Sequence, residues 1–185
     1  MRLFVSVDVD ELADAIADVQ ERFADASGLR LTEPEQAHVT LKFLGEVDPD
    51  RLPTLEEELA AAVEESGVAP FTATVGGLGV FPSLDYISVV WVGFETGGAE
   101  LTALHEAIEE RTVRMGFDPE DHDFTPHATI ARMDHAGGKD LVQEIVQTAD
   151  PIVGEVDVEE VRLTESTLSD DGPVYETRSR FPFLD

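Results

Sequence analysis

The sequence has no cysteine, so it excludes disulfide bonds, thiolate metal sites and cysteine nucleophiles. Lysine is scarce as well, occurring only as Lys42 and Lys139. Lysine and arginine together number 12 against 40 aspartates and glutamates, which gives the 185 residues a net charge of −28. A protein that coats nucleic acid regardless of sequence needs clustered basic side chains, and so does one that binds an anionic membrane surface. The composition argues against both classes.

Long apolar runs are also missing. The N-terminal segment reaches an acidic residue at Asp8, so it does not have the pattern of a signal peptide. The least charged stretch, 68–84, is interrupted by two prolines and three glycines, which breaks it too often for a membrane-spanning helix. We therefore expect a cytoplasmic protein, monomeric and without a membrane or protein partner.

The acidity is combined with an ordinary apolar content. Hydrophobic residues make up 42%, which is too many for a disordered acidic chain. Exposed carboxylates repel one another less in concentrated salt, because the Debye length falls to about 3 Å at 1 M. An acidic surface with few lysines is typical of proteins from salt-loving microbes, and we expect a halophilic origin.

The apolar pattern predicts strands and helices in a mixed order. Strands are expected over 2–9, 37–44, 71–80, 86–94, 124–133, 152–163 and 174–183, and helices over about 12–26, 52–66, 101–115 and 141–146. Because several strands are adjacent in sequence, an α+β fold with largely antiparallel sheet is favoured over a doubly wound parallel sheet. The length favours one domain over residues 1–185, either a single unit or two similar lobes.

One short motif occurs twice, about half the chain apart. His38 and Thr40 lie in AHVTLKFLG, and His127 and Thr129 lie in TPHATIARM. Each copy reads His, any residue, Thr, apolar, within a predicted strand. Side chains alternate between the two faces of a strand, so the histidine and threonine of each copy share a face. If the two strands lie side by side, two imidazoles and two hydroxyls surround one small volume.

This group of side chains suits displacement at phosphorus. A hydroxyl donates a hydrogen bond to a phosphoryl oxygen. An imidazole titrates near neutral pH, so one histidine can activate the nucleophile while the other protonates the leaving oxygen.

The same alternation places the neighbouring residues. It puts Lys42 on the face of Thr40, where its ammonium would attract phosphate, and Phe43 in the core. It puts Arg132 on the face opposite His127, unless the strand bulges there. Arginine is nevertheless well suited to bidentate contact with phosphate, so Lys42 and Arg132 are both candidate substrate-binding residues.

The two motifs resemble the signatures of the two-histidine (2H) phosphoesterases, and more narrowly of the RNA 2′,3′-cyclic phosphodiesterases, historically called 2′-5′ RNA ligases. HVTLKFLGEV is similar to the first signature of that family and FTPHATIAR to the second, while the start MRLFVSVDV resembles its first strand. The resemblance implies a bilobal α+β fold with a pseudo-twofold axis, largely antiparallel sheets, a central cleft and outer helices.

The resemblance also implies an activity, the hydrolysis of RNA 2′,3′-cyclic phosphate ends to a 2′-phosphate without a metal or cofactor. His127 would be the proton acceptor and His38 the proton donor, while Thr40 and Thr129 would hold the phosphate oxygens. Two alternatives stay open: a phosphoesterase acting on another cyclic nucleotide or oligonucleotide end, and a non-catalytic module that binds a nucleotide or an RNA end.

Other residues have more than one interpretation. Phe81 and Tyr175 would either stack a base or pack in the core. His105 is expected on the surface of a helix or partly buried. A zinc site made of His122, Asp123 and His127 is conceivable, although the spacing matches no metal motif.

Overall fold

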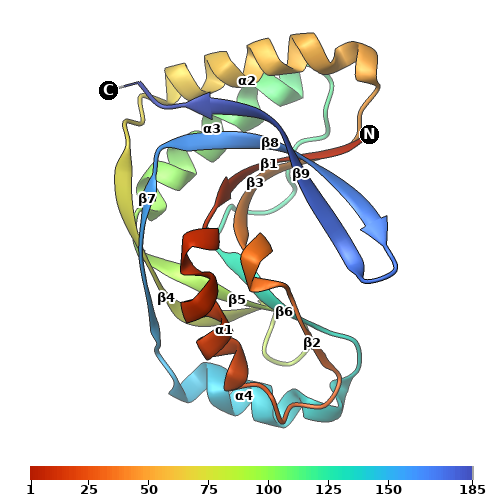
Figure 1. Ribbon diagram of the computed structural model, residues 1–185, viewed down its shortest axis with the longest axis vertical. Coiled ribbons are helices and arrows are strands. Elements are labelled where there is room, and N and C mark those ends of the chain that lie inside the picture. Colours follow the sequence, from red (N-terminus) through yellow and green to blue (C-terminus); the bar gives the residue numbers. More distant parts are fainter. Residues whose placement is uncertain (185) are drawn as a thin grey trace.

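In the computed structural model, which describes residues 1–184, nine strands form one antiparallel sheet. Its order is β7-β4-β5-β6-β3-β1-β8-β9, and β2 pairs with β6 (Figure 1). The strands are β1 (Arg2–Asp8), β2 (Leu29–Leu31), β3 (His38–Glu46), β4 (Phe71–Pro82), β5 (Ile87–Thr96), β6 (Ala128–Met133), β7 (Ile152–Val158), β8 (Glu160–Ser169) and β9 (Gly172–Pro182). The helices of the described chain are α1 (Ala13–Glu21), α2 (Leu52–Ser66), α3 (Gly98–Arg114) and α4 (Lys139–Thr148).

The α+β class with antiparallel sheet is confirmed, with corrections to the predicted strands. The strand predicted over 124–133 begins only at Ala128, so His127 precedes it. The run 152–163 is two strands, because β7 pairs with β4 near one edge of the sheet and β8 pairs with β1 near the other. The segment Leu29–Leu31, which is in none of the predicted strands, is a short strand paired with β6. Among the described residues, no helix has the length and apolar character required to cross a bilayer.

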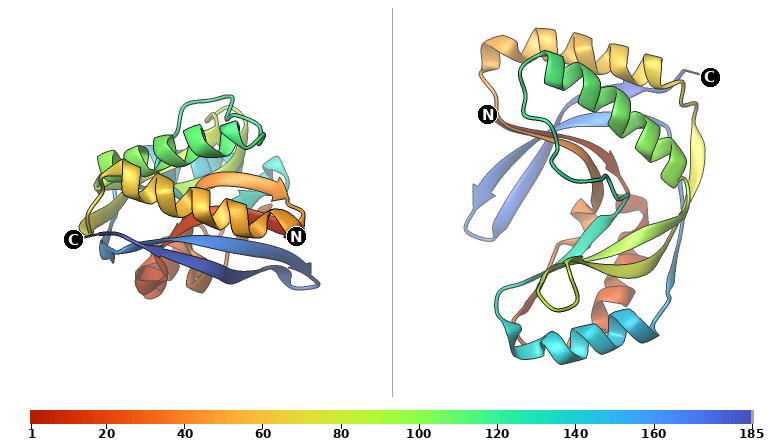
Figure 2. Two further views of the ribbon diagram at one scale, coloured as in Figure 1. Left: turned by 90° about the horizontal axis from the view of Figure 1, so that it is seen from above. Right: turned by 180° about the vertical axis from the view of Figure 1, so that it is seen from behind.

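The strand order is symmetric about the contact between β6 and β3. Outward from it lie β5, β4 and β7 on one side, and β1, β8 and β9 on the other. The central contact consists of the single register pair Val39 and Ala128. With so little pairing at the centre, the two halves diverge like the arms of a V (Figure 2). Helices α2 and α3 cover one arm, while α1 and α4 cover the other (Figure 1).

Apolar stripes explain how the helices are held. On α2 the buried residues are Leu55, Leu59, Ala62 and Val63, at the spacing of one helical face. The helix ends at Gly67, whose φ of 71° is the left-handed conformation that favours glycine at a C-terminal cap. With the helices on the outer faces, the inner faces of the two arms remain free for polar side chains.

Candidate active site

The two motif histidines lie where the arms of the sheet meet. His38 begins β3, and His127 immediately precedes β6. Each ring is held by the carbonyl two residues earlier: His38 Nδ1 is 2.9 Å from Gln36 O and His127 Nδ1 is 2.6 Å from Thr125 O. A carbonyl oxygen only accepts, so Nδ1 carries the proton in both rings and Nε2 is left for chemistry.

The pKa of His38 lies below its ordinary value. Burial has the largest effect and disfavours the imidazolium, and the positive charge of Arg132 acts in the same direction. The Gln36 carbonyl and the carboxylate of Asp8 oppose this effect by favouring the protonated ring. Asp8 is the register partner of His38 in the β1–β3 pair.

Burial also lowers the pKa of His127, although its neighbours differ. The Thr125 carbonyl favours its protonated form, but three positive groups, His38, Arg132 and His122, disfavour it. No carboxylate is among the groups that act on His127. The two histidines therefore make the same kind of hydrogen bond to a backbone carbonyl but have different charged neighbours.

Aromatic rings cause the burial of both histidines. Phe4 stacks on His38 with ring centroids 4.9 Å apart, and Tyr175 meets its edge at 5.2 Å. On the other arm, Phe81 meets the edge of His127 at 4.8 Å, and Trp91 lies 5.7 Å away. Phe81 and Tyr175 are thus partly buried packing partners of the histidines.

A bulge in β3 reverses the expected alternation after Thr40. Ser6 of β1 registers with Thr40, but the preceding residue of β1, Val5, registers with Lys42. Leu41 is therefore an extra residue, and the faces switch beyond it.

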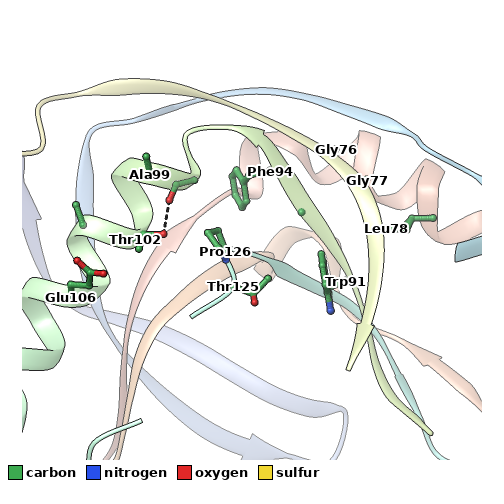
Figure 3. A pocket seen from close by; sticks show the side chains of 13 residues that line it. Gly76, Gly77, Leu78, Trp91, Phe94, Ala99, Thr102, Glu106, Thr125 and Pro126 are labelled. Carbon is green, nitrogen blue, oxygen red and sulfur yellow. Dashed lines mark hydrogen bonds between the residues drawn. The ribbon is translucent and has the colours of Figure 1, made fainter. Parts of the chain in front are cut away.

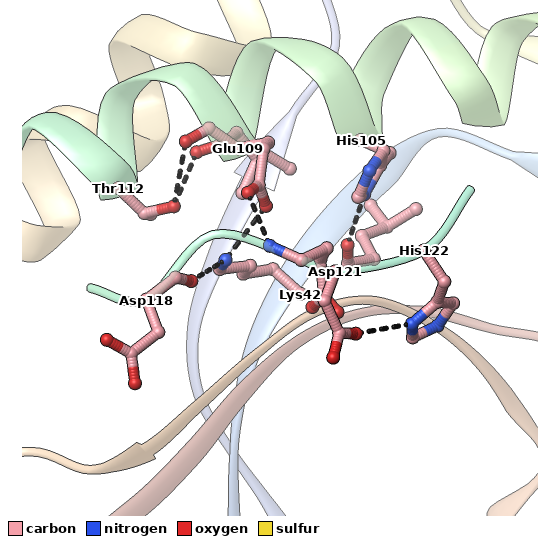
Figure 4. A network of polar contacts seen from close by, with 10 residues as sticks. Lys42, His105, Glu109, Thr112, Asp118, Asp121 and His122 are labelled. Atoms are coloured by element: carbon pink, nitrogen blue, oxygen red, sulfur yellow. Dashed lines mark hydrogen bonds and ion pairs between the residues drawn. The ribbon is translucent and has the colours of Figure 1, made fainter. Parts of the chain in front are cut away.

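The switch corrects two predictions. Lys42 points toward α3 on the helix side of the sheet and is only 1% exposed, so the prediction that it shares the face of Thr40 is wrong. Its Nζ donates to Glu109 Oε2 at 2.8 Å and to Asp118 O at 2.5 Å (Figure 4). Phe43, expected in the core, registers with Phe4 on the histidine face and is 64% exposed.

A matching bulge in β6 moves Arg132. Thr129 registers with Trp91, but Ala131 registers with the preceding residue of β5, so Ile130 is the extra residue. Arg132 consequently lies on the face of Thr129, the outcome that strict alternation excluded and a bulge allows. Its side chain is exposed, and the described residues offer its guanidinium no hydrogen bond or ion pair. Its charge lowers the pKa of both motif histidines.

Buried side chains from two helices hold the bulges. His105 Nδ1 of α3 donates to Leu41 O at 2.7 Å, and Gln20 Nε2 of α1 donates to Ile130 O at 2.9 Å. Both donors are buried, at 8% and 4% exposure, so the prediction of a surface or partly buried His105 is corrected. Its ring also stacks on Phe124, with centroids 4.3 Å apart. The carbonyl of each extra residue is thus paired by a helix behind the sheet.

Two hollows lie near the motif segments, and the smaller one is lined by His38. A polar one of about 180 Å³ lies beside His38 and includes Asp8 and Arg162, which form an ion pair. A larger open one of about 640 Å³ lies beside Thr125 and is walled by Trp91 and Phe94, with Glu106 of α3 at its side (Figure 3).

The conceivable zinc set of His122, Asp123 and His127 is not brought together. In the described part of the chain, the one group with metal-ligating atoms within 4.8 Å of one another is Glu120, Asp121 and His122. Of these, Asp121 and His122 are exposed, and the His122 ring pairs with the Asp121 carboxylate. Exposed acidic groups of this kind are common without a metal, so the group defines no site.

Comparison with known proteins gives a consistent result. The family model of the 2′-5′ RNA ligase superfamily matches residues 8–169. A protein of Archaeoglobus fulgidus named RNA 2′,3′-cyclic phosphodiesterase is 36% identical over 177 residues, covering 95% of this chain and 96% of that protein. A protein of the same name from Methanothermobacter thermautotrophicus is 35% identical over 178 residues, covering 95% of each.

Solved structures show the same fold. The crystal structure of TT0787 of Thermus thermophilus superposes with a TM-score of 0.81 at 28% identity, covering 99% of this chain and 98% of that one. The crystal structure of E. coli LigT complexed with 3′-AMP gives a TM-score of 0.81 at 24% identity, covering 100% and 98%. The bilobal α+β architecture implied by the motifs is confirmed.

Proposed function

Because the chain belongs to the 2′-5′ RNA ligase superfamily, we propose that it is an RNA 2′,3′-cyclic phosphodiesterase that opens a terminal cyclic phosphate to a 2′-phosphate. The observation that carries this proposal is the pairing of His38 and His127 at the junction of β3 and β6, each with its Nδ1 proton held by a backbone carbonyl. Two such imidazoles, each with Nε2 available, suit a reaction that needs one proton acceptor and one proton donor.

The electrostatic fields support distinct roles for the two histidines. His127 has only positive neighbours among its charged groups, so its neutral form is favoured and it suits the general base. His38 has the carboxylate of Asp8 beside it, which favours the imidazolium, so it suits the general acid.

The proposed reaction is a single in-line displacement. His127 Nε2 removes a proton from water, and the water oxygen forms a bond to phosphorus. The bond from phosphorus to O3′ breaks, and His38 delivers its Nε2 proton to that oxygen. The product carries a 2′-phosphate and a free 3′-hydroxyl, so the step balances without an oxidant or a cofactor.

Three further side chains would stabilise the charge on the phosphoryl oxygens. Thr40 and Thr129 share the faces of the histidines, and their hydroxyls can donate to non-bridging oxygens. Thr40 Oγ1 already lies 3.0 Å from His38 Nε2, which places this hydroxyl beside the reacting atoms. Arg132 adds a guanidinium on the same side, able to bind two oxygens at once.

The test uses a short oligonucleotide ending in a 2′,3′-cyclic phosphate, with EDTA present and in both low and molar KCl. Phosphorus NMR should show a 2′-phosphate product for the wild type. His38→Gln and His127→Gln should each lower kcat by at least about 100-fold, the usual contribution of a general acid or base. His135→Gln, at an exposed position on another loop, is the matched control. Equal activity in the motif variants and this control contradicts the proposal, and a 3′-phosphate product contradicts the assigned leaving group.

A further inference from the structure

The polar hollow beside His38 is not used by the proposed reaction. Its walls come from β1, β3, β8 and β9 and from the short 3₁₀ helix Pro34–Gln36. The hollow lies toward the Nδ1 edge of His38, because Gln36, whose carbonyl accepts from Nδ1, is one of its walls. The reaction uses Nε2, on the other edge of the ring. The hollow is therefore separated from the phosphate position by one imidazole, on the side of the histidine that protonates O3′.

The polar groups of its floor are already paired with one another. Ser6 Oγ and Thr164 Oγ1 lie 3.0 Å apart, and the two residues are 0% and 5% exposed. Asp8 and Arg162 form an ion pair. A buried polar network whose members are paired is rigid, so a ligand would meet a preformed surface.

Two polar groups at the rim are unpaired. Within residues 1–184, neither the exposed carboxylate of Glu35 nor the half-buried hydroxyl of Thr177 has a hydrogen-bond or ion-pair partner. A carboxylate only accepts, so Glu35 calls for a ligand that presents N–H groups. Asp8 and Glu35 together outnumber the charge of Arg162, which disfavours a phosphate. Pockets for drug-sized ligands usually measure about 300–1,000 Å³, so a hollow of about 180 Å³ takes a single ring system.

We propose that this hollow binds the nucleobase of the nucleotide on the 5′ side of the cyclic end, that Glu35 accepts from its Watson–Crick edge, and that guanine is preferred. The inference rests on the proposed function, since the chain must run from the phosphate past His38. Guanine offers a carboxylate two adjacent N–H groups. Uracil offers one N–H between two carbonyl oxygens, which a carboxylate repels. Single-stranded RNA is commonly read along this edge of the base, and such contacts need no positive charge.

The experiment uses four dinucleotides that end in adenosine 2′,3′-cyclic phosphate and carry guanosine, adenosine, cytidine or uridine as the first nucleoside. The wild type should have a kcat/KM for the guanosine substrate roughly tenfold above that for the uridine substrate, the discrimination of one bidentate contact to a base. Glu35→Gln should bring this ratio to about 1, because an amide offers one acceptor and one donor and so loses a bond to guanine while gaining one to uracil.

Glu33→Gln is the matched control, since it removes the same charge from an exposed position two residues away that does not line the hollow. It should keep the wild-type ratio. A wild type that hydrolyses none of the four dinucleotides refutes the proposed function. A wild type that hydrolyses all four equally well, or a preference that persists in Glu35→Gln, overturns this inference alone.

Adenosine 2′,3′-cyclic phosphate, which has no second base, completes the test. If Glu35→Gln lowers kcat/KM for this mononucleotide as much as for the guanosine dinucleotide, Glu35 acts on His38 or on the terminal nucleotide, and the inference is wrong.

Discussion

Phe43 and Arg132 occupy the same place in the two motif strands, five residues after His38 and His127, and both side chains lie on the histidine face. One arm of the sheet thus presents an apolar ring at the position where the other presents a guanidinium. The difference breaks the symmetry of the paired motifs. The two arms therefore present chemically different side chains beside the paired histidines.

Arg132 is expected to act on the transition state. Arg132→Ala should lower kcat by about 100- to 1,000-fold, because it removes a donor aimed at developing phosphoryl charge. Arg132→Lys should recover only part of the lost kcat, because an ammonium cannot make the bidentate contact that a guanidinium makes. In both variants the free energy of unfolding should stay within about 0.5 kcal/mol of the wild-type value, as is usual for exposed substitutions.

Arg30→Ala is the matched control, because Arg30 is the register partner of Arg132 on β2 and pairs with Asp134. Steady-state kinetics and urea denaturation measure the two quantities. A loss of stability without a loss of kcat would assign Arg132 a structural role instead.

Lys42 is expected to affect the stability of the protein and not its binding of substrate. Lys42→Met preserves most of the volume but leaves Glu109 without its ammonium partner, so the free energy of unfolding should fall by about 3 kcal/mol. That value is at the low end for a broken buried pair, because Glu109 also accepts from the Glu120 N–H. KM should not change. Urea denaturation with Lys139→Met as the control separates the two roles, and a raised KM at unchanged stability would restore Lys42 to the substrate site.

The motif residues could be predicted from the sequence, whereas those beyond them could not. Period-two alternation holds between His38 and Thr40, which are two residues apart, and again between His127 and Thr129. It fails for Lys42 and Phe43 because one extra residue, Leu41, inverts the positions that follow it. Neither Leu41 nor Ile130 is a glycine or any other local signal for a bulge, so the inversion is visible only in the register of the sheet.

The cause of each bulge lies far away in sequence. Gln20 and His105 come from helices whose periodicity shows that they are helical but not what their polar side chains contact. The sequence pattern was equally uninformative for β7 and β8. The predicted strand pattern runs through both without a break, although the two strands lie near opposite edges of the sheet. The sequence shows a glutamine and a histidine within predicted helices, but their burial and their partners depend on tertiary contacts.

Gln20 and His105 are therefore expected to act as positioning residues. Gln20→Leu leaves Ile130 O with one donor fewer and should reduce kcat, because the bulge that orients Arg132 is weakened. His105→Leu leaves Leu41 O without its side-chain donor and should also reduce kcat, because the bulge directly after Thr40 is weakened. Each should cost about 1–3 kcal/mol in stability.

Kinetics measured well below the melting temperature of each variant test this prediction. His105→Gln, which keeps a donor, should recover the wild-type kcat. A purely structural role would lower stability in both variants while kcat and KM of the folded enzyme stayed unchanged.

Asp8 is expected to influence the pH at which kcat/KM falls on the alkaline side of its pH profile. Its carboxylate raises the pKa of His38, and Arg162, which it neutralises, is an additional positive charge nearby. Asp8→Asn removes the favourable charge, so His38 should lose its proton at lower pH and kcat/KM should begin to fall at lower pH. The acidic limb, set by His127, should move less, because Asp8 acts on His127 only indirectly, through the charge of His38. Asp10→Asn is the control, and equal movement of both limbs would contradict the assigned roles.

The KM should depend only weakly on the salt concentration, although the proposed RNA substrate is a polyanion. Each phosphate that a protein neutralises on a single strand contributes about 0.7 to the slope of log affinity against log salt. Arg132 is exposed and unpaired among the described residues, whereas Lys42 is paired with Glu109, so one or two phosphates account for the binding. We expect the slope of log KM against log KCl to be about 1, and similar for a dinucleotide and a ten-residue oligonucleotide with the same cyclic end. A steep slope that grows with length would show contacts along the backbone, which a surface with a net charge of −28 is poorly suited to make.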